Sequence, residues 1–131
     1  METLTIKTDR REQFVAVTGK LEDLAVRNGW KDGVLFAHCP HTTAGLTINE
    51  NADPDVVRDI LATLERLVPA HGDYRHVEGN SDAHVKASLM GPGLTLIVEG
   101  GRIRLGTWQG VFFCEFDGPR TRQVWVQWIG K

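Results

Sequence analysis

The chain has 131 residues, of which 41% are hydrophobic and 24% are charged, and its formal net charge is -2. A charge this close to zero gives no electrostatic reason to bind nucleic acid or an acidic membrane, so neither is expected as a partner. No apolar run approaches the roughly 20 residues that span a bilayer, and the first residues lack a signal-peptide pattern, which predicts one cytoplasmic domain over residues 1–131.

The first elements have the pattern of strands. Residues 4–8 and 13–17 alternate polar and apolar side chains around a charged turn, which predicts a β-hairpin. A short helical pattern follows and ends at Gly29, a residue suited to a helix C-terminus. Residues 33–39 and 45–49 are the next predicted strands, separated by Pro40 and the sequence HTT.

The clearest predicted helix covers residues 52–69. Asp53 can accept hydrogen bonds from the free N–H groups of the first turn, and Pro54 suits the first helical position. The apolar side chains recur with helical spacing, so we expect one face of this helix to belong to the core. That face consists of Val57, Ile60, Leu61, Leu64 and Leu67.

The second half of the chain begins with a polar loop and continues mostly as strands. Residues 70–81 are polar and contain glycine, and Ser81 or Asp82 can begin a short helical turn that runs to Gly91. Strand-like runs separated by glycine fill the remainder. We therefore expect an α+β fold in which antiparallel β-sheets pack as a sandwich with two main helices.

The stretch HVEGNSDAHVKASLMG, residues 76–91, raises the question of a metal site, an acid/base centre or a polar turn. His76 and His84 are eight residues apart, which excludes the same-face helical pair of a zinc protease. A turn at Gly79 can still bring both into one pocket with His41 of the HTT sequence. Three histidines with an open fourth position are typical of a catalytic divalent metal.

Two further segments are candidates for ligand binding. LGTWQG, residues 105–110, has glycines on both sides of a polar and aromatic triplet, which lets a ligand approach the backbone. EFDGPRTR, residues 115–122, has two arginines after a turn, which suits phosphate or carboxylate recognition. A packed hairpin corner and an ordinary solvated turn are the alternative interpretations.

Three long motifs occur in a fixed order: HTTAGLTINENADPDVVRDIL, YRHVEGNSDAHVKASLMG and GGRIRLGTWQGVFFCEFDGPRTRQV. In this order and at these separations they resemble the YjbQ-like family, also called the secondary thiamine-phosphate synthase family. The resemblance covers nearly the whole chain. It implies an α+β fold, a homotrimer with pockets near subunit boundaries, and a weak thiamine-phosphate synthase activity that joins a pyrimidine diphosphate to a thiazole phosphate.

The resemblance also implies roles for residues that match the motifs. The catalytic set comprises His41, Glu50, Asn80, Asp82 and His84. The set that binds substrate or anion comprises Thr42, Lys86, Thr107, Trp108, Gln109 and Arg120. The metal set comprises His41, His76 and His84, with zinc or magnesium as the expected divalent metal. A metal with a lysine or arginine clamp would neutralise the leaving diphosphate.

Two alternatives remain open beside the synthase. One is a metal-dependent hydrolase of unknown substrate, because the chain has three candidate histidine ligands but no pair of aspartates of the kind that binds magnesium diphosphate. The other is a non-catalytic trimeric protein that binds a ligand. The four tryptophans and the terminal run VWVQWIG leave more apolar strand surface than a monomer of this size needs, which suits an obligate subunit interface such as the homotrimer that the resemblance implies. A phosphorylated small molecule is the expected ligand in the synthase interpretation.

Overall fold

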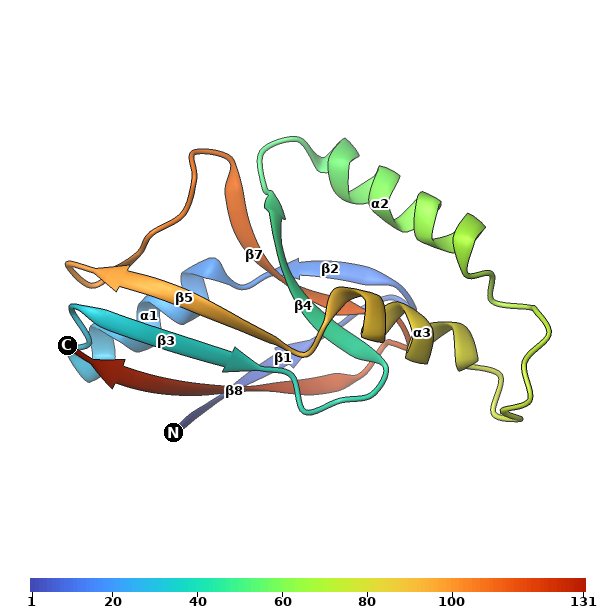
Figure 1. The fold of residues 1–131 in the computed structure, drawn as a ribbon, viewed down its shortest axis with the longest axis horizontal. Coiled ribbons are helices and arrows are strands. Elements are labelled where there is room, and N and C mark those ends of the chain that lie inside the picture. The colour runs from blue at the N-terminus through green and yellow to red at the C-terminus, as the bar shows by residue number, and fades with distance from the viewer.

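The computed structural model describes residues 1–131, which form eight strands and three helices (Figure 1). Their bounds are β1 Glu2–Lys7, β2 Gln13–Ala16, α1 Thr18–Asn28, β3 Gly33–His38, β4 Ala44–Glu50, α2 Pro54–Leu67, α3 Ser81–Met90, β5 Gly93–Glu99, β6 Arg102–Ile103, β7 Gln109–Glu115 and β8 Thr121–Gly130. None of these helices combines the length and the hydropathy needed to span a bilayer.

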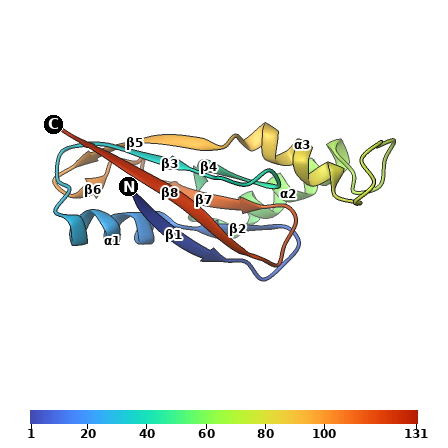
Figure 2. The same ribbon diagram turned by 90° about the horizontal axis from the view of Figure 1, so that it is seen from below.

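The strands form two antiparallel sheets. The first has five strands in the order β1-β8-β3-β5-β6, and the second has three strands in the order β2-β7-β4. Seventeen buried residues from both sheets and α1 form the main core. Figure 2 shows α1 beneath one end of the five-stranded sheet, whereas α2 and α3 lie at the opposite end of the molecule. The expected α+β fold with antiparallel sheets is confirmed.

The predicted hairpin of the first two strands is wrong. Strand β1 pairs with β8, with Glu2 opposite Val126, whereas β2 pairs with β7, with Gln13 opposite Glu115. Alternating polar and apolar residues define which face of a strand is buried, but they do not choose its partner. The charged turn between β1 and β2 therefore carries the chain from one sheet to the other.

Helix α2 begins as predicted but packs less deeply than expected. Asp53 accepts a hydrogen bond from the Asp55 N–H at 2.9 Å, and Pro54 is the first helical residue. Along the apolar face only Leu64 is buried, and Leu67 is 71% exposed. The other apolar residues of this face are half-buried against a second, smaller core of six residues beside β7. The expectation that the whole face belongs to the core is therefore wrong.

Candidate functional site

A polar pocket of about 350 Å³ lies where the β3–β4 loop, the start of α3 and the β7–β8 turn meet. Ten residues line it, and all except the proline are polar or charged. They are Pro40, His41, Thr42, Thr43, Glu78, Asn80, His84, Asp117, Arg120 and Arg122. The pocket thus brings together five residues predicted from the sequence for catalysis or for binding substrate, anion or metal. They are His41, Thr42, Asn80, His84 and Arg120.

The β3–β4 loop is held in place by close contacts with the end of α3. The Cys39 N–H donates to the Pro92 carbonyl oxygen at 2.7 Å, and the Leu46 N–H donates to the Gly91 carbonyl oxygen at 3.0 Å. A Cβ atom at Gly45 would lie 2.7 Å from that same Gly91 oxygen, closer than real Cβ atoms approach. Glycine at position 45 therefore lets β4 meet α3, which brings the HTT loop beside His84.

His41 is a neutral imidazole with a defined tautomer. Burial lowers its pKa below the ordinary value of 6.5, and the positive charge of Arg122 lowers the pKa further. The Gln123 N–H donates to His41 Nε2 at 2.9 Å, and this bond assigns the ring proton to Nδ1. His41 can therefore donate one hydrogen bond from Nδ1 near neutral pH, without carrying a charge.

The second histidine of the pocket, His84, lies on the first turn of α3. Its ring centroid is 5.3 Å from that of His76, whose side chain is 44% exposed and lies 3.7 Å from a Glu78 carboxylate oxygen. An adjoining cavity of about 310 Å³ is also lined by His41, Thr42 and His84, so these three residues separate the two hollows. The imidazoles of His41 and His84 can thus contact a ligand in either of the two hollows.

The three histidines do not assemble as a metal-ligand set. No group of three or more His, Cys, Asp or Glu side chains in the structure is arranged to hold a metal ion. His76 packs edge-on against the His84 ring, but it does not line the polar pocket that His41 and His84 share. A divalent cation stays a prediction that metal analysis of the purified protein would check.

Asn80, Asp117 and Arg120 form a hydrogen-bonded wall of the pocket. Asn80 Nδ2 and Arg120 Nη2 both donate to Asp117 Oδ2, at 2.9 and 3.0 Å. Arg120 Nε donates to the Asp117 carbonyl oxygen at 2.7 Å, which leaves Nη1 of this half-exposed guanidinium for a ligand. The Asn80 Oδ1 and Ser81 Oγ atoms are buried at the start of α3 without a partner in the chain.

A buried ion pair lies beneath this wall. Arg122 is 5% exposed and Glu115 is fully buried, and two guanidinium nitrogens of Arg122 donate to the two carboxylate oxygens of Glu115. Arg122 Nη2 also donates to Thr43 Oγ1 at 2.8 Å, and Thr8 Oγ1 donates to Glu115 at 2.8 Å. The pair therefore ties the HTT loop to β7 and β8, and it positions the pocket rather than offering a free charge.

Lys86, expected to hold phosphate, lies in a different environment. Its side chain is fully buried on α3, and Nζ contacts carboxylate oxygens of Glu65 at 2.7 Å, Glu12 at 3.1 Å and Asp82 at 3.3 Å. Asp82 also accepts two hydrogen bonds from Arg11. Neither Lys86 nor Asp82 lines the polar pocket, so the structure gives both residues a role in tying α2 and α3 to the β1–β2 loop.

The GTWQ segment lies at the far end of the three-stranded sheet. Glu50, the last residue of β4, pairs with Gln109, the first residue of β7, whereas Ala44 at the pocket end pairs with Glu115. The Gln109 side chain accepts a hydrogen bond from the Gly106 N–H, and Trp108 is 64% exposed. Glu50 and Gln109 therefore lie at the opposite end of the β4–β7 pair from the polar pocket, and neither they nor Thr107 and Trp108 line it.

Three pocket residues were not singled out from the sequence: Thr43, Glu78 and Asp117. Arg122 was considered only as one of the two arginines of EFDGPRTR that suit an anion, and its buried role was not predicted. Arg122 had a usable signal, because it shares the inward-facing parity of Val124 and Val126 along β8. A charged residue at an inward position of a strand needs a buried partner. The sequence pattern thus predicts a partner for Arg122, although it does not identify Glu115 as that partner.

Comparisons with known proteins agree on one family. The family model described as "UPF0047 protein YjbQ-like" matches residues 2–131. The UPF0047 protein YugU of Bacillus subtilis is 48% identical over 131 residues and covers 99% of both chains. The UPF0047 protein MJ1081 of Methanocaldococcus jannaschii is 50% identical over 125 residues, 95% of this chain and 91% of the relative.

Solved structures of similar proteins have the same fold. The crystal structure of an uncharacterized conserved YjbQ/UPF0047 protein from Clostridium acetobutylicum is 53% identical, with a TM-score of 0.95 over 98% of this chain and 100% of that one. A conserved hypothetical protein from Thermus thermophilus is 46% identical, with a TM-score of 0.93 over 98% of this chain and 100% of that one.

The expected thiamine-phosphate synthase function is corrected by these findings. The relatives and solved structures are named as UPF0047 or uncharacterized proteins, and none of their names indicates that activity. The metal chemistry expected for the reaction also lacks its ligand group in the chain. The same absence removes the basis for the metal-dependent hydrolase, because that interpretation depended on three converging histidines.

Proposed function

Since the chain belongs to the UPF0047 family of YjbQ-like proteins, whose name assigns no reaction, the chemistry of its polar pocket has to indicate the function. We propose that this pocket binds the phosphate group of a small molecule. The observation that carries the proposal is the convergence of Arg120, His41 and His84 in a pocket without a hydrophobic side-chain wall. Hydrogen-bond donors of this kind from separate segments are what phosphate oxygens require.

Three features support an anionic ligand. Arg120 offers Nη1, His41 offers Nδ1–H, and Thr42 offers an exposed hydroxyl from the same loop. Asn80, the residue before α3, lines the pocket, so the positive end of the helix dipole faces the ligand. Because Asp117 partly neutralises Arg120, we expect inorganic phosphate alone to bind weakly and the remainder of the molecule to add affinity.

We expect Arg120→Ala to weaken the binding of inorganic phosphate about tenfold, because one charge-assisted hydrogen bond is worth about 1.5–3 kcal/mol at best and Asp117 already engages the guanidinium. Phosphate titration followed by NMR of the imidazole and backbone signals measures the affinity. The matched control is Arg66→Ala, which removes an exposed arginine of α2 outside the pocket. Equal phosphate affinity in Arg120→Ala and the unmodified protein would remove the proposal.

We also propose that copies of the chain associate as a homotrimer through the outer face of the five-stranded sheet. Val34 pairs with Ile97 on one side and Ile129 on the other, which makes one apolar row across three strands. Phe36 and Trp125 continue the apolar surface, at 38% and 39% exposure, and Ile97 and Ile129 are more than half exposed. An apolar sheet face of this kind is typical of an interaction surface.

Trp125→Glu is expected to dissociate the trimer, because a carboxylate would be buried in the apolar contact without a partner. Light scattering coupled to size-exclusion chromatography measures the mass, which should fall from about three times 14.6 kDa to the mass of one chain. Ala62→Glu places the same charge on an exposed residue of α2, away from the five-stranded sheet, as a control. A mass of 14.6 kDa for the unmodified protein would exclude the trimer.

A further inference from the structure

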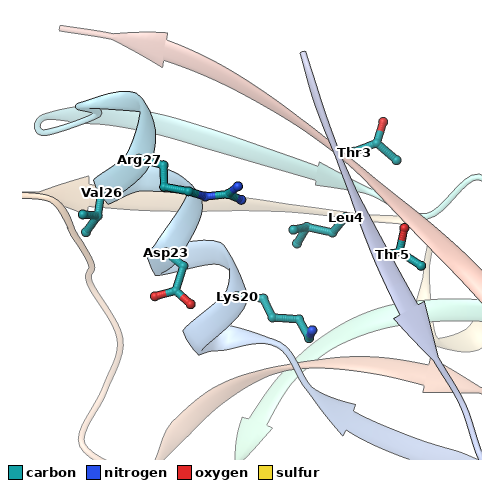
Figure 3. Close-up of a pocket in the computed structure, with 7 residues that line it drawn as sticks. All are labelled: Thr3, Leu4, Thr5, Lys20, Asp23, Val26 and Arg27. Carbon is teal, nitrogen blue, oxygen red and sulfur yellow. The ribbon is translucent and has the colours of Figure 1, made fainter.

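A groove of about 580 Å³ runs between strand β1 and helix α1, as Figure 3 shows. Three consecutive residues of β1 form one wall, and four residues of α1 form the other. None of them lines the polar pocket. The lining residues are Thr3, Leu4, Thr5, Lys20, Asp23, Val26 and Arg27.

Strand β1 presents main-chain hydrogen-bonding groups along this groove. It is an edge strand, because β8 is its only neighbour in the five-stranded sheet. The Thr8 N–H donates to the Arg120 carbonyl oxygen at 3.0 Å, in register with the β1–β8 pairing. Because main-chain groups of an antiparallel strand alternate between its two sides, Thr3 and Thr5 direct their N–H and C=O groups to the open edge.

The helical wall of the groove carries two unpaired cations. Lys20 and Arg27 are seven residues apart on α1, about 10 Å along the helix axis. Neither takes part in a salt bridge, and both are exposed. Figure 3 shows their side chains extending from α1 toward β1, whereas the carboxylate of Asp23 is directed away from the strand. The groove therefore combines an open strand edge with an excess of positive charge.

We propose that this groove binds an extended acidic segment of another protein, which adds to the five-stranded sheet as a strand beside β1. The main-chain groups of Thr3 and Thr5 match those of alternate residues in an incoming strand. Lys20 and Arg27 select acidic side chains on the face of that strand that is turned toward α1. Main-chain pairing gives affinity for an extended chain, and the two cations give the preference for acidic sequence.

Charge also decides against a second copy of the chain as the occupant. Pairing of β1 with β1 across a two-fold axis would bring the Lys20 and Arg27 side chains of both copies to the same groove region. β1 itself contributes Lys7 and a single acidic residue, Glu2. Four helix cations around one strand pair repel each other, whereas an acidic segment neutralises them.

The test uses a fluorescein-labelled heptapeptide in which valine and glutamate alternate. We expect saturable binding to the unmodified protein by fluorescence anisotropy, and weaker binding as the salt concentration rises. A peptide with lysine in place of glutamate, and one with N-methylated main-chain amides, should each bind about tenfold less tightly. Hydrogen exchange at the Thr3 and Thr5 amides should slow when the acidic peptide is bound.

The double variant Lys20→Glu/Arg27→Glu should lose about tenfold in affinity for the acidic peptide, whereas Arg66→Glu on α2 should not change it. Thermal melts of both variants report whether the fold is retained. Equal binding of the acidic and basic peptides, equal binding of the methylated peptide, or an unchanged affinity in the double variant would overturn the proposal. So would the absence of saturable binding, or a dimer whose cross-links join β1 to β1.

Discussion

Lys86→Met is expected to lower the free energy of unfolding by about 3–5 kcal/mol, because it leaves a set of carboxylates without the buried cation that they share. Lys86 and Asp82 are fully buried, and Glu12 is only 21% exposed. Methionine retains most of the apolar volume, so the loss measures the charge and its hydrogen bonds. Urea unfolding followed by circular dichroism gives the free energy, with an unchanged m-value if the native state is retained.

Lys31→Met is the matched control, because Lys31 is an exposed lysine that forms no salt bridge. We expect it to change the free energy of unfolding by no more than about 0.5 kcal/mol. A small effect of both substitutions would mean that water reaches the carboxylates around Lys86 and that the cluster is not a structural tie. The contrast between two lysines of the same chain therefore isolates the contribution of burial.

Arg122→Met is expected to cost a similar amount, about 3–5 kcal/mol, because Glu115 would remain buried without its cation. Arg104→Met, which breaks an exposed pair with Glu99, should cost less than about 1 kcal/mol. The double variant Arg122→Met/Glu115→Gln should recover part of the loss, since the uncompensated charge is then absent. Urea unfolding of the unmodified protein, Arg122→Met, Glu115→Gln and the double variant gives the coupling energy as a double-mutant cycle.

The pH dependence distinguishes this charge effect from a packing effect. Burial alone would raise the pKa of Glu115, but the hydrogen bonds from Arg122, the Asp117 N–H and Thr8 more than offset it and lower the pKa below 4.5. In the unmodified protein this carboxylate therefore contributes stability above pH 4.5 that is lost as the pH falls through its folded pKa. Without Arg122, burial raises the pKa, so the deficit of Arg122→Met should narrow on acidification. A deficit that stays constant with pH would indicate lost packing instead.

Local sequence signals predicted the elements better than their partners. The Asp53-Pro54 start of α2 and the short helix after Ser81 follow from backbone chemistry within one turn, and the structure has both. The partner of β1 lies more than a hundred residues away in β8, and no local pattern carries that information. Periodicity therefore predicted which residues of β1 are buried, but not which strand pairs with β1.

In the candidate site, too, local sequence features were predicted better than long-range partners. His41, Asn80, His84 and Arg120 come from motifs that look polar and glycine-rich in sequence, and the structure gathers them in one pocket. Lys86 is one helical turn beyond Asp82, and in the sequence it looked as available to bind phosphate as Arg120 did. Its burial depends on Glu12 and Glu65, which arrive from the β1–β2 loop and α2. A lysine's partners are set by tertiary packing, so sequence alone could not distinguish a binding lysine from a structural one.

The position of β8 in the five-stranded sheet has a consequence for synthesis of the chain. It lies between β1 and β3, and it pairs with β1 through residues 121–126 and with β3 through residues 125–130. As residues 121–130, it emerges from the ribosome after every other strand and helix. Until then β1 has no neighbour, β3 has an open edge, and the Glu115 carboxylate has no Arg122. The nascent chain therefore waits for its last strand before the larger sheet can close, a period in which unpaired edges are open to chaperones and to aggregation.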